Sequence, residues 1–408
     1  MIIKGPVNFI RSNQTSLFEH VKPLYEWSEK ESYLTLEEIK VRDTAGAIVC
    51  YHNPPVHQVG NAALDAYLVV LSLMQARQKE LQFLIMYSAN DPIHAGGDLK
   101  ESLVQLDRTL ELRKNLLVKG SSAADIDLLY NWGDERLQKA FQLYRALRQL
   151  GKDTRIIGIC GGGARYGGSA ELVLMADVIV GDSRSAICFS EVLLGLIPGW
   201  GGIGRTISRS GLLNARYLAY TAAECPAADL KKMGIFNTVV DVPLALPRLQ
   251  KTADPQADKI RYQEALQKNN DETGPLLLAA ALELAVCPQS AILRLDPQKR
   301  AALLTEEKLT AVIKMRSNFA NYRRLVNKPL VEVKEELTRM GRPLAPQSVA
   351  ALDTLFAKYD AATFDEERFI EQEMQLDARL YRDRRFRAGI TATLEQRVPD
   401  FDGNDEPS

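Results

Sequence analysis

The sequence predicts a mixed α/β fold with a mostly parallel sheet, followed by a helical C-terminal region. Three observations support this prediction. Short apolar runs typical of buried strands alternate with helical segments between residues 81 and 189. A strand–helix–strand order favours stacked βαβ units, and the pattern after Gly211 is nearly all helical. The 408 residues suffice for two or three domains, or for one domain with additions.

Alternating β-formers, apolar residues at helical spacing, and turn residues define the elements of the first hundred residues. In chain order we expect a short helix around Leu17–Ser28, a β-hairpin over Tyr33–Tyr51, a helix over Ala62–Lys79 capped by Asn61, a strand over Leu81–Tyr87, a loop over Asp91–Gly97 and a helix opening at Asp98–Glu101.

The same signals continue to residue 189. We expect amphipathic helices over 102–150, broken near Gly120–Ser122 and Asn131–Gly133, then a strand over Arg155–Cys160, a glycine loop over Gly161–Gly168, a helix over Ser169–Asp177 and strands at Val178–Gly181 and Ala186–Phe189.

Composition excludes several classes of function. A net charge of −1 gives no reason to expect nucleic acid or an anionic membrane as partner. The apolar stretch Pro275–Cys287 is shorter than a membrane span, and Met1–Pro6 lacks the pattern of a secretory signal. Five scattered cysteines predict reduced thiols in a cytoplasmic protein, and no metal site is expected.

Two glycine loops stand at predicted strand-to-helix junctions. The loop Gly161–Gly168 fails as a dinucleotide, phosphate or nucleophile loop: Tyr166 replaces a required glycine, no lysine is present, and Glu171 replaces the last glycine of GxSxG. What remains is a helix N-terminus whose amide groups stabilise negative charge. The second loop, His94–Lys100, has the same character, and two facing amides would form an oxyanion hole. Each loop alone is more often a tight turn.

Three segments together resemble the crotonase (enoyl-CoA hydratase/isomerase) family. Residues Ala95–Glu101 resemble the signature A-G-x-D-[LI]-K-E, and Gly167–Asp177 resemble G-G-G-x-E-L with a later A-D. Residues Ser190–Gly202 are similar to P-E-x-x-L-G-x-x-P-G-x-G-G. The end of the chain, Leu394–Phe401, is close to L-E-K-R-x-P-x-F, and the match covers roughly residues 34–101, 152–245 and 366–403.

The resemblance implies a crotonase-like spiral of ββα units and a set of site residues. Gly97 and Gly168 match the positions whose amides hold the thioester oxygen as it gains enolate charge. Glu171 and Glu191 match the two acid/base glutamates of the hydratases. Without the resemblance, Glu171 would be a glutamate of a helix's first turn and Glu191 a surface glutamate at a strand end.

Four further residues are expected to touch substrate: Ala95 and Asp98 in the first signature, His94 as a polar contact near the acyl path, and Trp200 as a wall of the acyl pocket. Ser190 departs from the family, which has proline there. The resemblance places a core at 34–245 with a helical insertion over 102–150, after an N-terminal extension at 1–33. A second helical insertion is expected at 246–365, and a family-type C-terminal helix and tail at 366–408.

The predicted function is hydration or dehydration of a 2-enoyl-CoA thioester. Coenzyme A enters as part of the substrate, and no permanently bound cofactor is expected. The resemblance implies a homotrimer or hexamer. Two alternatives stay open at this point: other crotonase chemistry on acyl-CoA (isomerase, thioester or ring-opening hydrolase, or decarboxylase), and a non-catalytic acyl-CoA-binding scaffold.

Overall fold

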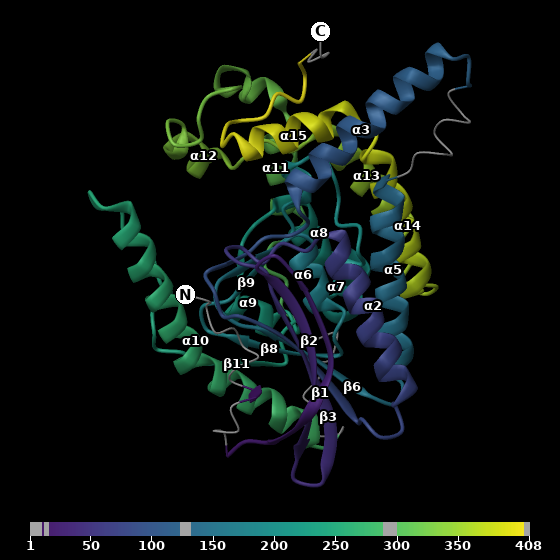
Figure 1. Cartoon of the computed structure of the whole chain (residues 1–408). Coiled ribbons are helices and arrows are strands. Elements are labelled where there is room, and N and C mark those ends of the chain that lie inside the picture. The colour runs from purple at the N-terminus through teal and green to yellow at the C-terminus, as the bar shows by residue number, and fades with distance from the viewer. Residues whose placement is uncertain (1–9, 12–15, 123–131, 289–299, 404–408) are drawn as a thin grey trace. The chain divides into compact units, whose positions relative to one another are not determined.

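The computed structural model of the chain describes residues 10–11, 16–122, 132–288 and 300–403 (Figure 1). It divides into two compact units. Unit 1 comprises Met1–Gly96, Gln142–Cys188 and Glu224–Ala301. Unit 2 comprises Gly97–Phe141, Phe189–Ala223 and Ala302–Ser408. The chain therefore passes between the units several times, and each unit gathers segments that are far apart in sequence.

Unit 1 contains a seven-stranded sheet with the strand order β1-β2-β3-β4-β6-β8-β11. The first three strands are antiparallel, and the pairs from β3 to β11 are parallel. Parallel strands are buried on both faces, which explains the continuous apolar runs in β4 and β6. The strands are β1 (Glu19–Glu29), β2 (Ser32–Val41), β3 (Thr44–His52), β4 (Phe83–Ser88), β6 (Arg155–Cys160), β8 (Val178–Asp182) and β11 (Thr238–Val240).

A second, four-stranded sheet in unit 1 has the order β10-β9-β7-β5. Its strands are very short: β5 (Ile93–His94), β7 (Ala164–Tyr166), β9 (Ala186–Cys188) and β10 (Cys225–Pro226). Strands β5 and β7 run parallel, with His94 opposite Arg165. This sheet therefore joins the two glycine loops singled out in the sequence.

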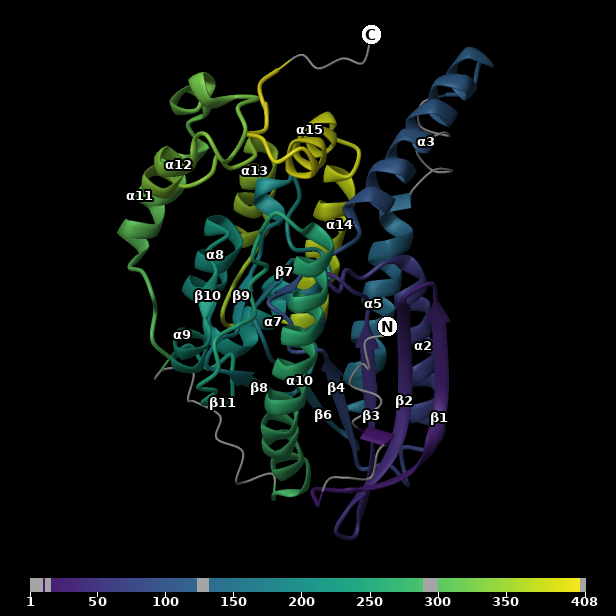
Figure 2. The same cartoon turned by 60° about the vertical axis from the view of Figure 1, so that its left-hand side comes forward.

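The helices of unit 1 are α2 (Asn61–Ala76), α6 (Gly168–Leu174), α9 (Ala227–Lys232) and α10 (Pro255–Val286), and α5 (Trp132–Leu150) ends in this unit. Helix α10 lies against β6 and β8 (Figure 2). Its apolar residues Leu277, Leu278, Ala281, Leu282 and Ala285 recur at helical spacing and share one core cluster with strand residues such as Ile157 and Val180. Helix α10 is therefore part of the core of unit 1.

Unit 2 is helical in the part that the structure describes. Its helices are α3 (Leu99–Val118), the first part of α5, the 3₁₀-helix η1 (Glu191–Leu193), α7 (Gly202–Ser210), α8 (Leu212–Thr221), α11 (Glu306–Ser317), the 3₁₀-helices η4 (Phe319–Asn321) and η5 (Arg323–Leu325), α12 (Lys334–Met340), α13 (Pro346–Phe356), α14 (Glu366–Leu380) and α15 (Arg384–Leu394). One apolar cluster joins residues around η1, α7 and α8 to α13–α15.

Most predicted elements are confirmed, including the hairpin, the strands that became β4, β6, β8 and β9, and the helix opened by Asp98. The short helix expected around Leu17–Ser28 is wrong, because this segment is strand β1, paired along β2. The cap expected at Asn61 is also wrong: Gly60 is the N-cap of α2 and makes no side-chain bond. Strands β10 and β11 were not predicted, nor were β5 and β7, which lie within the segments Asp91–Gly97 and Gly161–Gly168 that were expected to be loops.

The segment 246–365, predicted as one helical insertion, contributes to both units: α10 belongs to unit 1 and α11 to α13 belong to unit 2. All the predicted domain bounds stay predictions. Among the described residues, no helix combines the length and the apolarity needed to cross a membrane.

Candidate active site

The junction between β7 and α6 presents an open helix N-terminus. Gly167 is the N-cap, with φ of 52° and ψ of −132°, a conformation that favours glycine. Its carbonyl accepts from the N–H groups of Ala170 and Glu171 at 2.8 and 3.0 Å, and its own N–H donates to Cys188. No side chain caps this helix. An α-helix leaves its first N–H groups without partners inside the helix, and here the first of them belongs to Gly168.

Gly96 lies directly against this N-terminus, within unit 1. A Cβ at Gly96 would stand 2.9 Å from the Tyr166 carbonyl oxygen and 3.0 Å from the Gly168 nitrogen. Real Cβ atoms rarely come so near, so the space admits only glycine unless the backbone shifts. The structure therefore brings the chain that leads into Gly97 next to the Gly168 amide, which sequence spacing alone does not reveal.

The peptide between Gly96 and Gly97 has a fixed orientation. The Gly96 carbonyl accepts from the Val59 N–H at 2.9 Å, and the Ala95 N–H donates to the Val56 carbonyl at 2.6 Å. A trans peptide is planar, with its C=O and N–H pointing in opposite directions. The Gly97 N–H therefore points away from Val59.

Glu171 lies in the first turn of α6, and its side chain is 2% exposed. The same turn that opens the helix at Gly167 places this carboxyl three residues after the Gly168 amide. A carboxyl near a helix N-terminus is stabilised in its charged form by the helix dipole. Glu171 is thus a buried acidic group on the helix that carries a predicted amide donor.

In unit 2, helix α3 begins with a closed N-terminus. The Asp98 carboxylate accepts from the N–H groups of Lys100 and Glu101 at 2.9 and 3.0 Å. Arg136, which is 1% exposed, pairs with Glu101 and donates to the Ser102 hydroxyl at 3.1 Å. A Cβ at Gly97 would lie 3.0 Å from the Arg136 guanidinium, so a buried cation borders the Gly97 position.

Glu191 opens η1 in unit 2, and its side chain is 7% exposed. Its carbonyl accepts from the N–H groups of Leu194 and Leu196, and the carbonyl of Val192 accepts from Ala345 at 3.0 Å. Ser190, which stands where the family has proline, adopts φ of −85°, within about 20° of the angle that proline fixes. The backbone that presents Glu191 is therefore held on both sides.

The end of the third family-like segment, Ser190–Gly202, is held by two buried carboxylates of α14, also in unit 2. Glu373, which is fully buried, accepts from the N–H groups of Gly201 and Gly204 at 3.0 Å and of Ile203 at 3.4 Å. Asp377 accepts from the Ile197 N–H at 3.0 Å. Trp200, between these contacts, is 4% exposed.

His94 lies in a buried stack of histidines in unit 1. Its ring is 4.7 Å from that of His57, which in turn is 5.0 Å from His52. Arg165 contacts the His94 ring at 3.4 Å and donates to the Ser88 hydroxyl at 2.8 Å. Burial, the Arg165 charge and the neighbouring histidines hold the pKa of His94 well below its usual value. Burial and His57 lower the pKa of His52 to about 4. Both rings are therefore neutral at neutral pH.

The predicted site residues are divided between the units. Gly168, Glu171, His94 and Ala95 lie in unit 1, whereas Gly97, Asp98, Glu191 and Trp200 lie in unit 2. Sequence reasoning missed several residues that hold these segments. They are Arg136, Glu373, Asp377, and the buried pair of His57 and Asp91, whose side chains are joined by a hydrogen bond of 2.8 Å. Their partners are distant in sequence, so only the fold reveals them.

Known proteins share both sequence and fold with this chain. Residues 122–269 match the family model described as Enoyl-CoA hydratase/isomerase. The "Probable enoyl-CoA hydratase, mitochondrial" of Dictyostelium discoideum is 27% identical over 190 residues, which are 47% of this chain and 58% of that protein. The "Short-chain-enoyl-CoA hydratase" of Clostridioides difficile is 30% identical over 86 residues, or 21% of this chain and 56% of that protein. The matches thus span little more than half of either relative.

Two solved structures share the fold. An enoyl-CoA hydratase from Rhodobacter sphaeroides 2.4.1 aligns with a TM-score of 0.53 at 16% identity, covering 88% of this chain and 90% of that one. A carnitinyl-CoA dehydratase from Mycobacterium thermoresistibile aligns with a TM-score of 0.52 at 15% identity, covering 86% and 88%. The two structures therefore show the fold of this chain, and its residues 122–269 are similar to the Enoyl-CoA hydratase/isomerase family.

Proposed function

We propose that this chain binds a 2-enoyl-CoA thioester and catalyses its reversible hydration. The amides of Gly97 and Gly168 stabilise the enolate oxygen, and Glu171 and Glu191 serve as the acid/base pair. The observation that carries the proposal is the close approach of Gly96 to the Gly168 amide. This approach places the segment that leads into Gly97 beside the segment that bears Gly168, and these are the two proposed donors. The names of the two relatives support the same chemistry.

The open N-terminus of α6 supports the proposed oxyanion hole. An amide that no side chain caps is available to a ligand oxygen, and the helix dipole adds to its attraction for negative charge. The peptide before Gly97 is fixed by Val59, so its N–H needs little reorganisation when charge develops. Removing one donor of such a hole costs about 100- to 1000-fold in rate.

In the proposed hydration, the oxygen of a water molecule forms a bond to C3 of the enoyl group. The electron pair of the C2–C3 double bond moves toward the thioester carbonyl, whose oxygen becomes the enolate oxygen. One glutamate accepts a proton from the water, and the other delivers a proton to C2. Both carboxyls are buried, as suits side chains that exchange protons with a bound substrate.

Loss of the ultraviolet absorption of crotonyl-CoA tests the proposal directly. We expect turnover by the unmodified chain and a loss of about 100- to 10,000-fold in Glu171→Gln and in Glu191→Gln, the range for general acid–base groups. Glu264→Gln, on the exposed face of α10, is the matched control and should keep full activity.

Product analysis over short, long and cyclic enoyl-CoAs separates this proposal from its alternatives. A shifted double bond would identify an isomerase, and free coenzyme A or an opened ring would identify a hydrolase. Tight acyl-CoA binding without turnover, unaffected by Glu171→Gln, would identify a scaffold. Each of these results contradicts hydration as the activity.

We also propose a homotrimer or hexamer in the cytoplasm. Among the described residues, α3 exposes Val104, Leu110, Leu112, Leu117 and Val118, and exposed apolar surface of this kind is typical of interfaces. None of the five cysteines, all of them among the described residues, forms a disulfide, as expected in a reducing compartment. Light scattering at several concentrations gives the mass of the assembly, and a monomer would contradict the proposal.

A further inference from the structure

The loop from Asn53 to Val59 holds the proposed donor segment from both ends. Its Val56 carbonyl accepts from Ala95, and its Val59 N–H donates to Gly96. Any displacement of this loop therefore turns the peptide whose N–H belongs to Gly97, because that peptide is rigid and planar.

The loop is in turn held by a buried His57–Asp91 pair. The Asn53 N–H donates to His57 Nδ1 at 3.2 Å, so this nitrogen carries no hydrogen. The ring proton lies on Nε2, which donates to Asp91 Oδ2 at 2.8 Å. Both side chains are nearly excluded from solvent, with exposures of 1% and 7%. His57 therefore links the loop to Asp91 through a hydrogen bond in which His57 is the donor and Asp91 the acceptor.

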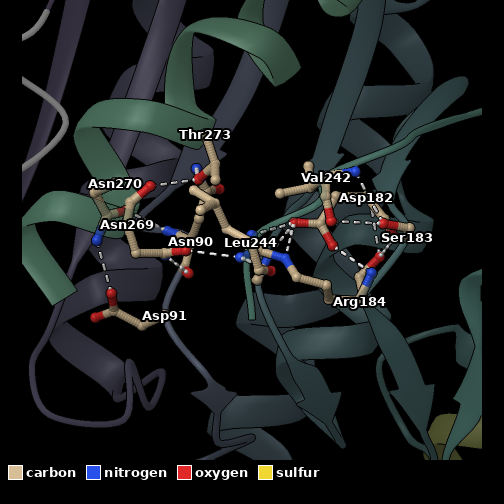
Figure 3. A network of polar contacts seen from close by, with 12 residues as sticks. Asn90, Asp91, Asp182, Ser183, Arg184, Val242, Leu244, Asn269, Asn270 and Thr273 are labelled. Atoms are coloured by element: carbon tan, nitrogen blue, oxygen red, sulfur yellow. Dashed lines mark hydrogen bonds and ion pairs between the residues drawn. The ribbon is translucent and has the colours of Figure 1, made fainter. Parts of the chain in front are cut away.

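Asp91 is anchored to α10 through Asn270 (Figure 3). Asn270 Nδ2 donates to Asp91 Oδ1 at 2.8 Å, and Asn270 Oδ1 accepts from the Asn90 N–H at 2.6 Å. The backbone donor at Asn90 fixes which end of the Asn270 amide faces Asp91. The second amide hydrogen of Asn270 reaches the Leu266 carbonyl at 3.0 Å, so its polar atoms are all used.

A second set of contacts fixes the same corner. Asn269 donates to the Asn90 carbonyl at 2.7 Å and accepts from Arg184 at 2.7 Å, and Arg184 pairs with Asp182 at 2.7 Å (Figure 3). The Asp182 carboxylate also accepts from the Gly162 N–H at 2.8 Å, in the loop before β7. Within unit 1, α10 thus binds Asn90 and Asp91 directly, and it is linked to Gly162 through Arg184 and Asp182.

We propose that Asn270 of α10 is a positioning residue for the thioester site, acting through Asp91 and His57 on the loop that orients the Gly97 amide. The inference rests on the proposed function, and it gives α10 a role in chemistry beyond its apolar contacts with the sheet. Asn270 does not touch the reacting atoms; it sets the direction of a donor.

The test uses the amide-to-carboxylate change Asn270→Asp, which is nearly isosteric. One carboxylate oxygen still accepts from Asn90, but the other faces the Asp91 carboxylate and repels it. We expect kcat for crotonyl-CoA to fall roughly 10- to 100-fold with KM little changed, the usual cost of a misplaced catalytic group. Adding Asp91→Asn reverses the donor and acceptor of the bond between the two side chains and keeps an acceptor oxygen for His57. The double variant should regain much of kcat but not all of it, because the Leu266 carbonyl still lacks its donor.

Infrared spectroscopy of bound acetyl-CoA, labelled with ¹³C at the thioester carbonyl, reads the donor directly. Hydrogen bonds to the carbonyl lower its stretching frequency. We therefore expect a downshift in the unmodified chain, a smaller downshift in Asn270→Asp, and a larger downshift again in the double variant that adds Asp91→Asn. Gln267→Glu, the same change on α10 outside this network, is the control and should match the unmodified chain. Should Asn270→Asp fail to fold, Asn270→Ala removes the donor without adding charge and should show the same smaller downshift.

The two proposals fail differently. If the unmodified chain binds acetyl-CoA with a downshift that Asn270→Asp and Asn270→Ala leave unchanged, the positioning role is wrong and the proposed function stands. If the unmodified chain shows no binding and no downshift, the proposed function is wrong, and the positioning role is overturned with it.

Discussion

Three helix N-termini border the predicted site residues: two are capped by a carboxylate, and one has no side-chain cap. Helix α3 is capped by its own Asp98, and the N–H groups at the start of α7 are bound by Glu373 from distant α14. Helix α6 has no side-chain cap. Carboxylates therefore bind the first amides of α3 and α7, whereas no side chain caps the Gly168 end of α6. The difference separates an N-terminus that stabilises the fold from one that suits an anionic ligand.

Removing the distant cap of α7 should have the largest effect. Glu373→Leu leaves three buried N–H groups of Gly201, Ile203 and Gly204 without their acceptor. Each orphaned group costs about 1 to 3 kcal/mol, so we expect the loss of all three acceptors to lower the free energy of unfolding by about 3 to 9 kcal/mol. Urea unfolding measures it. Glu373→Gln keeps one acceptor oxygen and should lose less; equal stability of all three chains would show that α7 does not need this cap.

Gly96→Ala should have the next largest effect and should act on the open terminus. The added Cβ meets backbone atoms of Tyr166 and Gly168 that cannot swing aside. We expect turnover of crotonyl-CoA to fall about 100-fold, equivalent to about 2.7 kcal/mol. Gly97→Ala meets only the end of the Arg136 side chain, which can move, and should lose less. The reverse order of the two variants would contradict the tight approach seen at Gly96.

Local pattern predicted much of the fold. Apolar runs revealed β4, β6 and β8 because strands buried on both faces carry a continuous signal. Strand β1 was missed because it is the edge strand of the large sheet and mostly exposed, so its sequence lacks a core face. Strands β10 and β11 were missed because two and three residues hold no period to detect.

The site was predictable only as far as local motifs extend. The glycine loops and both glutamates stand in recognisable segments. Glu373 and Asn270 do not, because each acts on a partner more than 150 residues away. One signal was present: two adjacent asparagines, Asn269 and Asn270, lie within a helix that they do not favour. Such residues in a helix interior suggest that their side chains serve a tertiary contact.

The buried histidine His52 should make the stability of the chain depend on pH. His52 has a pKa of about 4 in the folded chain and about 6.5 when unfolded. The unfolded state therefore binds the proton first, and stability falls as pH drops from 6.5 toward 4. Between pH 7 and pH 5 we expect a loss of about 2 kcal/mol from this residue. In His52→Phe, urea unfolding should show a loss smaller by that amount. An unchanged pH profile would mean that His52 is not a neutral, buried ring.

Asp98→Ala should have the smallest effect and bears on the role of this residue. Loss of an N-cap costs about 1 kcal/mol, and the amides of Lys100 and Glu101 should exchange hydrogen faster. Asp98→Asn keeps a capping oxygen and should retain most of the stability. If Asp98 only caps α3, KM for crotonyl-CoA should be equal in both variants. A KM raised in both, with stability lost in Asp98→Ala alone, would assign the charge to substrate binding and the capping oxygen to the fold.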